Sequence, residues 1–359
     1  MKKHIRRLVG LAAGLAASVG AAHAQSNVQL YGVMDLYVAK RQLASTSGNS
    51  TTSVGSGGMT TSQWGMRGQE DLGSGLKAMF DVSGFIRADT GETGRFPNDP
   101  MFSRTTMVGL QAPWGTLRMG RLTTPNFIST IRLNPFADST TFNPVTLHTY
   151  LGGQPLEAAI ASGGPAGVSD SAFNNSVAYT SPNLSGFSAA FQHSFGGIAG
   201  GANKRMGYSL TYGSGPLLVS LSGESVDQPT LAAPPVVPAT NQKQGQDTVQ
   251  LGASYDFNVI QLFAQWSQTE VKLPASAARD FTTVQLGAAA PLGMGKLLFS
   301  VADTTRTETA RSDVKRTTWA LGYDHPISKR TDLYTVFMRD QVTGLQNGST
   351  VAAGIRHRF

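Results

Sequence analysis

A two-residue alternation in the final stretch, residues 349–359, sharply limits the folds open to this chain. One set of alternate positions is mostly apolar and ends on an aromatic ring: Val351, Ala353, Ile355, His357 and Phe359. The other set is small or cationic: Thr350, Ala352, Gly354, Arg356 and Arg358. A period of two puts the two sets on opposite faces of a β-strand. The pattern therefore predicts a strand with one apolar and one polar face.

A membrane β-barrel explains such a strand better than a soluble fold does. Chain ends of soluble proteins are usually polar and frayed, whereas this apolar face ends on Phe359. In a barrel the apolar face contacts lipid, the polar face lines a wet interior, and aromatic rings lie at the membrane interfaces. The strand must also pair with the first strand, because hydrocarbon does not tolerate an open sheet edge.

The first 24 residues have the pattern of a secretory signal peptide. Lys2, Lys3, Arg6 and Arg7 precede an apolar run at 8–22, and Ala22-His23-Ala24 fits a cleavage site. The run is too short and too rich in Ala and Gly to span a membrane comfortably. We therefore expect residues 1–24 to be removed and residues 25–359 to form the barrel. Loss of those four basic residues lowers the formal charge from +7 to +3, which weakens the case for a nucleic-acid partner.

Alternation recurs along the whole chain, and the connections between alternating segments have two lengths. Short turns are expected at 71–75, 112–115, 181–186, 213–216, 256–258, 290–295 and 324–331. Longer polar segments are expected at 41–61, 87–103, 123–172, 196–205, 227–246, 272–280, 306–313 and 341–348. Seven turns and eight loops separate 16 strands, so both termini fall at the short-turn end. Short periplasmic turns and long external loops are typical of bacterial outer-membrane barrels.

The segment at 123–172 is an outlier among these loops, with little periodicity over its length. Loops this long are usually functional or disordered. This one carries apolar residues, including Ile128, Leu133 and Phe142, so we expect it to pack against the barrel interior.

Several segments resemble the general diffusion porins of β-proteobacteria and Neisseria. They are LYG at 30–32, GQEDLGSGLKA at 68–78, GTLRMGR at 115–121, ISKRTDLY at 327–334 and GIRHRF at 354–359. The resemblance implies an all-β, 16-stranded antiparallel transmembrane barrel, narrowed by an inward-folded third external loop at 123–172. It further implies a homotrimer in outer-membrane lipid, and a final strand whose Ile355 and Phe359 form the signal read by the outer-membrane insertion machinery.

Signatures of catalysis and of cofactor binding are missing from the sequence. There is no His-Glu-x-x-His, Gly-x-Ser-x-Gly, P-loop or Gly-x-Gly-x-x-Gly motif, and no cysteine. The four histidines that follow the signal peptide, His148, His193, His325 and His357, have no metal-ligand spacing. We therefore expect that the protein is not an enzyme and that it binds no cofactor and no metal ion.

Basic residues near the long loop are the candidates for the functional site. Alternation puts Arg67, Lys77 and Arg118 on polar strand faces, and Arg121 lies where the loop begins. Each could simply solvate the wall or reach lipid headgroups. Together, facing the loop acids Asp138, Glu157 and Asp170, they would create a transverse field, and fixed charges of this kind select ions in pores.

Three functions remain open on the sequence alone. The first is a passive, water-filled and modestly anion-selective porin for ions and small hydrophilic solutes. The second is a substrate-specific channel of the same fold, with a binding track on its loop. The third, a secreted adhesin or outer-membrane enzyme, is disfavoured by the missing catalytic motifs and by the polar alternation, which an adhesin would not need.

Overall fold

The computed structural model describes residues 27–44, 48–97, 99–150, 171–196, 204–227, 245–272, 278–309 and 312–359. The expected signal peptide at 1–24 lies outside them. The strands are β1 (Asn27–Gln42), β2 (Ser50–Ser56), β3 (Gln63–Gly73), β4 (Leu76–Arg87), β5 (Glu92–Thr93), β6 (Thr105–Ala112), β7 (Gly115–Thr123), β8 (Ala172–Thr180), β9 (Phe187–Ser194), β10 (Arg205–Ser214), β11 (Leu217–Asp227), β12 (Gly245–Asp256), β13 (Gln261–Lys272), β14 (Ala278–Leu292), β15 (Gly295–Glu308), β16 (Val314–Pro326), β17 (Thr331–Val342) and β18 (Gly348–Arg358). The helices α2 (Pro125–Arg132) and α3 (Pro144–Thr149) follow β7.

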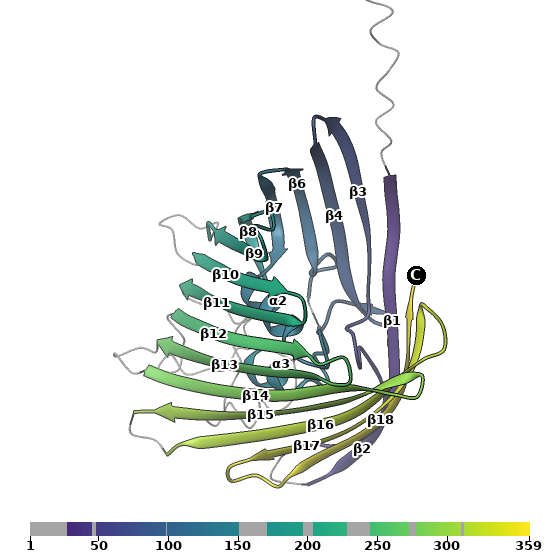
Figure 1. Ribbon diagram of the computed structural model, residues 1–359. Coiled ribbons are helices and arrows are strands. Elements are labelled where there is room, and N and C mark those ends of the chain that lie inside the picture. The colour runs from purple at the N-terminus through teal and green to yellow at the C-terminus, as the bar shows by residue number, and fades with distance from the viewer. Residues whose placement is uncertain are drawn as a thin grey trace, which may run out of the picture.

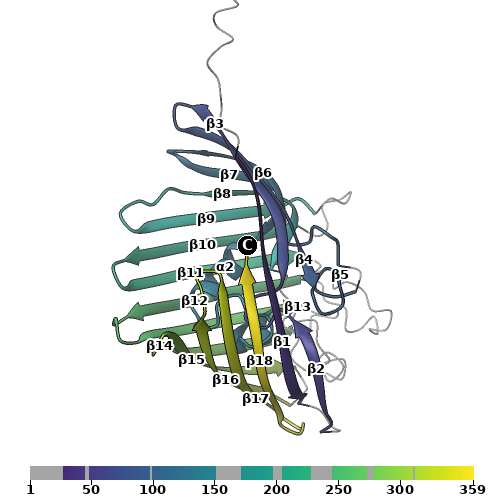
Figure 2. The same ribbon diagram turned by 90° about the vertical axis from the view of Figure 1, so that its right-hand side faces the viewer.

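These strands form one antiparallel sheet that closes on itself (Figure 1). β18 pairs with β1 from Val33↔Arg358 to Gln42↔Ser349, and the two strands run side by side in Figure 2. β2 and β3 pair with successive parts of β1 and together make one wall strand, while β5 pairs only with β4. Within the described residues the wall therefore has 16 strands, which confirms the predicted fold class.

The seven short connections lie where the sequence predicted them, but the first long loop is shorter than predicted. The pattern predicts a loop over 41–61, but Ser50–Ser56 forms β2, paired with Leu36–Gln42 of β1. Its sequence, STTSVGS, has almost no apolar alternation, so periodicity could not reveal it. Pairing with β1 supplies the backbone hydrogen bonds that a lone polar segment lacks.

The outer surface of the barrel is apolar. Val28 and Leu30 in β1 are 61% and 58% exposed, and Leu251 and Leu286 are 50% and 55% exposed. Their sequence neighbours on the other face, such as Gln250 and Gln285, are buried against the interior. In the last strand Val351 and Ile355 are likewise exposed, while Thr350, Ala352 and Arg356 are buried. This arrangement suits lipid outside and polar groups inside.

The two helices lie within the curve of the strands (Figure 1). α2 contacts β9, β10, β11 and β12, and α3 contacts β14, β15 and β16. Between them Phe136 and Phe142 are fully buried in a cluster with Tyr37, Tyr334 and Ala320. A Cβ on Gly322 would lie 3.0 Å from the Phe136 ring, so this glycine lets the ring pack tightly against β16. Among the residues that the structure describes, no helix has the length and apolar character needed to cross a bilayer.

Candidate functional site: the charged lumen

The local sequence explains why α2 begins where it does. The Thr124 hydroxyl accepts a hydrogen bond from the Phe127 amide, and Pro125 occupies the first turn. A side-chain cap followed by proline is a favourable helix start, because proline has no amide to leave unsatisfied. The helix therefore turns the chain away from the end of β7 and along the inner wall.

Polar side chains dock this helix onto the barrel. Ser129 hydrogen-bonds to Ser220 of β11 at 2.9 Å, and Thr130 donates to the Gln250 side chain of β12 at 2.8 Å. Gln265 of β13 donates to the Leu133 carbonyl at 2.7 Å. These buried bonds satisfy the amide side chains of the wall. The β7–β8 loop contacts the strands β9–β18 through its residues 125–149. We call these strands the covered wall.

Acidic groups of the covered wall are paired with arginines on neighbouring strands. Arg279 binds Glu308 at 2.8 Å, and Arg316 binds Asp340 at 2.9 Å. Arg356 contacts both Asp324 and Asp332, at 2.8 and 3.0 Å. Because these four carboxylates each have a cation beside them, they contribute little net field to the lumen.

The strands β3, β4, β6 and β7, which we call the facing wall, carry cations with a different environment. The Arg67 guanidinium donates to the Gln29 side chain at 2.9 Å and lies 4.9 Å from the centre of the Tyr31 ring. Arg104, just before β6, reaches the Tyr31 hydroxyl and the Ser83 hydroxyl, both at 3.4 Å. These hydrogen-bond partners are neutral, and among the described residues neither guanidinium forms an ion pair, although Asp81 lies opposite Arg67 in register.

Arg118 and Lys77 also lie on the lumen face of this wall. Arg118 pairs in register with Ala178, which is buried, and donates to Thr180 at 3.1 Å. Lys77 shares its strand face with Asp81, whose carboxylate accepts from Tyr31 at 2.8 Å. The structure thus brings three of the four basic residues singled out from the sequence onto one wall.

The fourth, Arg121, does not face the lumen. It pairs with Thr106, which shares an outward face with the exposed Val108 and Leu110, and it donates to Asn174 at 2.7 Å. The reason is strand parity: three positions separate Arg118 from Arg121, so their side chains point to opposite faces. The placement of Arg121 on the pore wall is therefore corrected.

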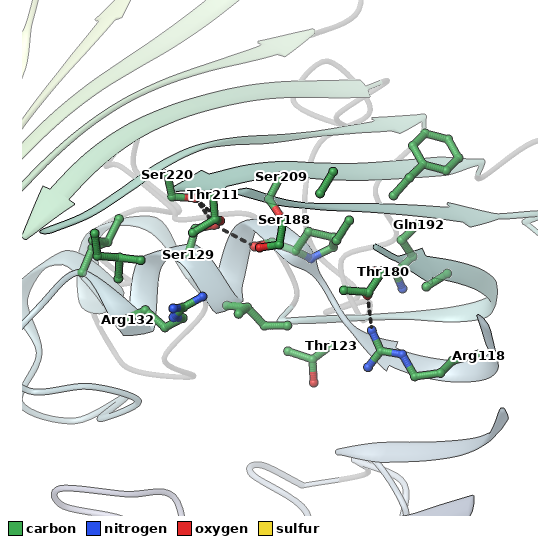
Figure 3. A pocket seen from close by; sticks show the side chains of 18 residues that line it. Arg118, Thr123, Ser129, Arg132, Thr180, Ser188, Gln192, Ser209, Thr211 and Ser220 are labelled. Atoms are coloured by element: carbon green, nitrogen blue, oxygen red, sulfur yellow. Dashed lines mark hydrogen bonds between the residues drawn. The ribbon is translucent and has the colours of Figure 1, made fainter. Parts of the chain in front are cut away.

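A recess of about 160 Å³ opens between α2 and the strands β7–β11 (Figure 3). Arg118 and Arg132 both line it, together with the hydroxyls of Thr180, Ser188 and Ser209. Two guanidinium groups facing hydroxyls can hold a hydrated anion or a small polar solute.

Sequence reasoning about the wall missed Arg104 and Arg132. Arg132 is in the last turn of a helix within a loop, and Arg104 directly precedes a strand. Neither position is reached by strand alternation. The Thr124-Pro125 pair could have signalled the helix that carries Arg132, since it is a helix-start pattern.

Of the predicted loop acids, only Asp138 is among the described residues. Its carboxylate is half-buried and accepts from the Thr60 hydroxyl at 3.2 Å. Burial raises the pKa of Asp138, and the bond from Thr60 and the nearby Arg104 partly oppose that shift. Glu157 and Asp170 lie outside the described residues.

The histidine of the loop is held inside the barrel rather than in a metal site. Both ring nitrogens of His148 bind threonine hydroxyls, Nδ1 to Thr304 at 2.8 Å and Nε2 to Thr318 at 2.7 Å. Burial, with Arg316 nearby, holds the pKa of His148 well below its usual range. Within the described ranges, no group of three or more potential ligands could hold a metal ion.

The chain end closes the barrel seam. The Phe359 amide and carbonyl exchange hydrogen bonds with Gly32 at 3.1 Å each. Phe359 is 43% exposed, and Ile355, four residues earlier on the same face of the strand, is 47% exposed. Both side chains therefore present apolar surface on the outside of the last strand.

Comparison with known proteins agrees with this architecture. Residues 10–345 match a family described as Gram-negative porin. The chain is 31% identical to outer membrane porin protein 32 of Delftia acidovorans, over 99% of this chain and 95% of that protein. It is 28% identical to an outer membrane porin protein of Bordetella pertussis, over 97% of this chain and 98% of that protein.

A solved structure described as an anion-selective porin from Comamonas acidovorans superposes with a TM-score of 0.74. That comparison covers 93% of this chain and all of the other, at 28% identity. The family consists of channels rather than enzymes. The closed 16-stranded barrel, its apolar exterior and these matches establish that the chain belongs to the Gram-negative porins, the channel proteins of the bacterial outer membrane.

Proposed function

We propose that the channel passes ions and small hydrophilic solutes by passive diffusion, with a modest preference for anions. The observation that carries this proposal is an asymmetry of charge pairing across the lumen. Among the described residues, ion pairs neutralise four carboxylates of the covered wall: Glu308, Asp324, Asp332 and Asp340. In the part of the chain that the structure describes, no ion pair involves the cations that border the lumen on the other side: Arg67, Lys77, Arg104, Arg118 and Arg132.

The preference is modest because acids also border the same space. Asp81 lies on the facing wall and Asp138 on the loop. At physiological salt the screening length is about 8 Å, so fixed charges act over the width of a narrow pore. At about 1 M salt it falls to about 3 Å, and the preference should weaken. The similar Comamonas porin is described as anion-selective, which supports the same sign.

Reversal potentials in a KCl gradient test this proposal. The double variant Arg67→Ala plus Arg118→Ala should shift the reversal potential toward cation preference. The matched control, Lys329→Ala plus Arg330→Ala, removes the same charge from the short β16–β17 connection and should leave the potential unchanged. A cation-selective parent, or a double variant identical to it, would contradict the proposed filter.

A substrate-specific channel is the second candidate. The recess between α2 and the strands β7–β11 is the observation that favours it. Its two guanidinium groups and hydroxyls could retain an anionic solute. Concentration-dependent block of single-channel current by one small carboxylate, abolished by Arg132→Ala, would support this candidate. Ohmic current with no solute block would support general diffusion.

We also propose that the β7–β8 loop forms the constriction, that three barrels assemble, and that the last strand is read by the insertion machinery. The trimer is supported by the outward polar group of Thr106, Arg121 and Asn174, which suits protein contact better than lipid. A trimeric mass in mild detergent, unchanged by chelators, is the expected result. A monomeric mass would contradict the assembly.

A further inference from the structure

The wall strand made by β2 and β3 is interrupted. β2 pairs with Leu36–Gln42 of β1, and β3 pairs with Asn27–Val33. Residues 57–62, between them, leave the sheet, and we call this segment the bracket. Backbone groups that leave a sheet inside a barrel need other partners, because buried unpaired groups are costly.

A single residue of β1, Asp35, supplies those partners. Its carboxylate accepts from the backbone amides of Gly58, Met59 and Thr60 at 3.1, 2.8 and 2.8 Å. Its own backbone exchanges two bonds with the Ser62 hydroxyl, each 3.0 Å long. The side chain of Asp35 is fully buried. A buried carboxylate that accepts several amide bonds makes strong, charge-assisted hydrogen bonds.

Tyr334 of β17 completes the arrangement. Its hydroxyl donates to Asp35 at 2.5 Å, and Tyr334 belongs to the buried cluster around Phe142. A Cβ on Gly58 would lie only 2.0 Å from the Tyr334 oxygen. The bracket thus packs closely between β1 and β17.

The bracket in turn holds the tip of the β7–β8 loop, residues 138–141. Ser139 donates to the Gly58 carbonyl at 2.6 Å, and Thr141 donates to the Gly57 carbonyl at 2.7 Å. The hydroxyls of Thr61 in the bracket and Thr140 in the loop tip also hydrogen-bond, at 3.1 Å.

Asp138 makes the fourth contact, with Thr60 at 3.2 Å. Within the described part of the chain, every side-chain hydrogen bond from residues 138–141 to the barrel ends on the bracket.

We propose that Asp35 is a positioning residue for the pore opening. It fixes the bracket, and the bracket fixes the loop tip. Asp35 touches no permeating ion in this scheme; it determines how wide and how steady the opening is. The proposal rests on the chain being a channel and is independent of whether the channel prefers anions.

Asp35→Asn tests the proposal, because an amide keeps the shape but replaces one acceptor oxygen with a donor that faces backbone amides. We expect folded barrels whose single-channel current loses its one steady level and shows a spread of levels. The matched control is Asp303→Asn, the same change on the outward face of β15, where the carboxylate accepts from Thr317 at 2.6 Å. It should keep one level.

An engineered disulfide provides a second test, and it can be introduced cleanly because the chain has no cysteine of its own. Thr61→Cys plus Thr140→Cys, added to Asp35→Asn, should restore the steady level when oxidised and lose it again when reduced. Thr248→Cys plus Thr269→Cys joins β12 to β13, where the hydroxyls are 3.0 Å apart, and should not restore it.

If Asp35→Asn does not fold, Ser139→Ala plus Thr141→Ala removes bracket bonds while leaving Asp35 intact, and should produce the same unsteady current. A steady level in a folded Asp35→Asn channel, or in this second variant, would overturn the proposal. So would failure of the oxidised Thr61–Thr140 bridge to restore the level.

Discussion

The ring of Phe359 occupies the space that a side chain on Gly32 would need. A Cβ at Gly32 would lie 2.3 Å from the tip of the ring, while the two backbones exchange a pair of hydrogen bonds. Gly32 therefore admits the last side chain of the closing strand into the seam, and this contact can be tested directly.

Gly32→Ala should destabilise the barrel by about 1–3 kcal/mol, the usual cost of forcing extra volume into a packed site. The expected readout is a lower temperature for the heat-dependent shift in electrophoretic mobility. Gly213→Ala in β10 is the matched control, because its Cβ would meet only Leu218 at 3.6 Å. Equal shifts in both variants would show that the Phe359 ring is not restrictive.

Phe359→Ala should reduce the amount of folded barrel in the outer membrane, and loss of residues 354–359 should reduce it further. The truncation removes backbone pairs of β18 with Leu36, Tyr37 and neighbouring β1 residues, so part of the seam is left open in lipid. Membrane yield and heat-modifiable mobility are the measurements. A truncated chain with normal values of both would contradict the prediction.

Acid should loosen the β7–β8 loop through His148. Buried beside Arg316, the docked imidazole has a pKa well below its usual range, whereas an undocked imidazole has a pKa of about 6.5. The undocked form thus binds more protons, and docking is fully favourable above about pH 6.5 and weakens as the pH falls below it.

Single-channel current at about pH 7 and about pH 5 tests this expectation. The parent should be steady at the higher pH and unsteady at the lower, and His148→Gln should show no such pH dependence. His193→Gln, a change in β9 outside the loop, should behave like the parent. Identical pH responses in the parent and His148→Gln would exclude His148 as the acid-sensitive group.

The barrel was predictable because a two-residue period and turn lengths are local properties of the sequence. Val28 and Leu30 alternate with Gln29 and Tyr31, and the structure exposes the first pair outward. The same parity rule, applied to Arg121, would have placed it correctly on the outside. Alternation predicts that Arg118 faces the lumen, and in the structure it pairs with the buried Ala178.

The bracket was not predictable by these means. Asp35 alternates like any lumen-facing residue, but its partners are backbone amides of a broken strand and a tyrosine near the other end of the chain. Arg132 was hidden for a related reason, since a helix inside a loop has no strand parity. Contacts made by segments that leave the sheet depend on tertiary placement, which alternation does not encode.

Closure of β1 on β18 also determines when the barrel can be completed. The register joins Val33 to Arg358, so the contacts with the greatest sequence separation are the ones that remove the last free edges. Contacts of high contact order carry a large loop-closure entropy and form slowly. A folding intermediate with every hairpin in place would still expose two unpaired strands, which are templates for aggregation. The chain is thus most vulnerable to aggregation at the step immediately before its wall is complete.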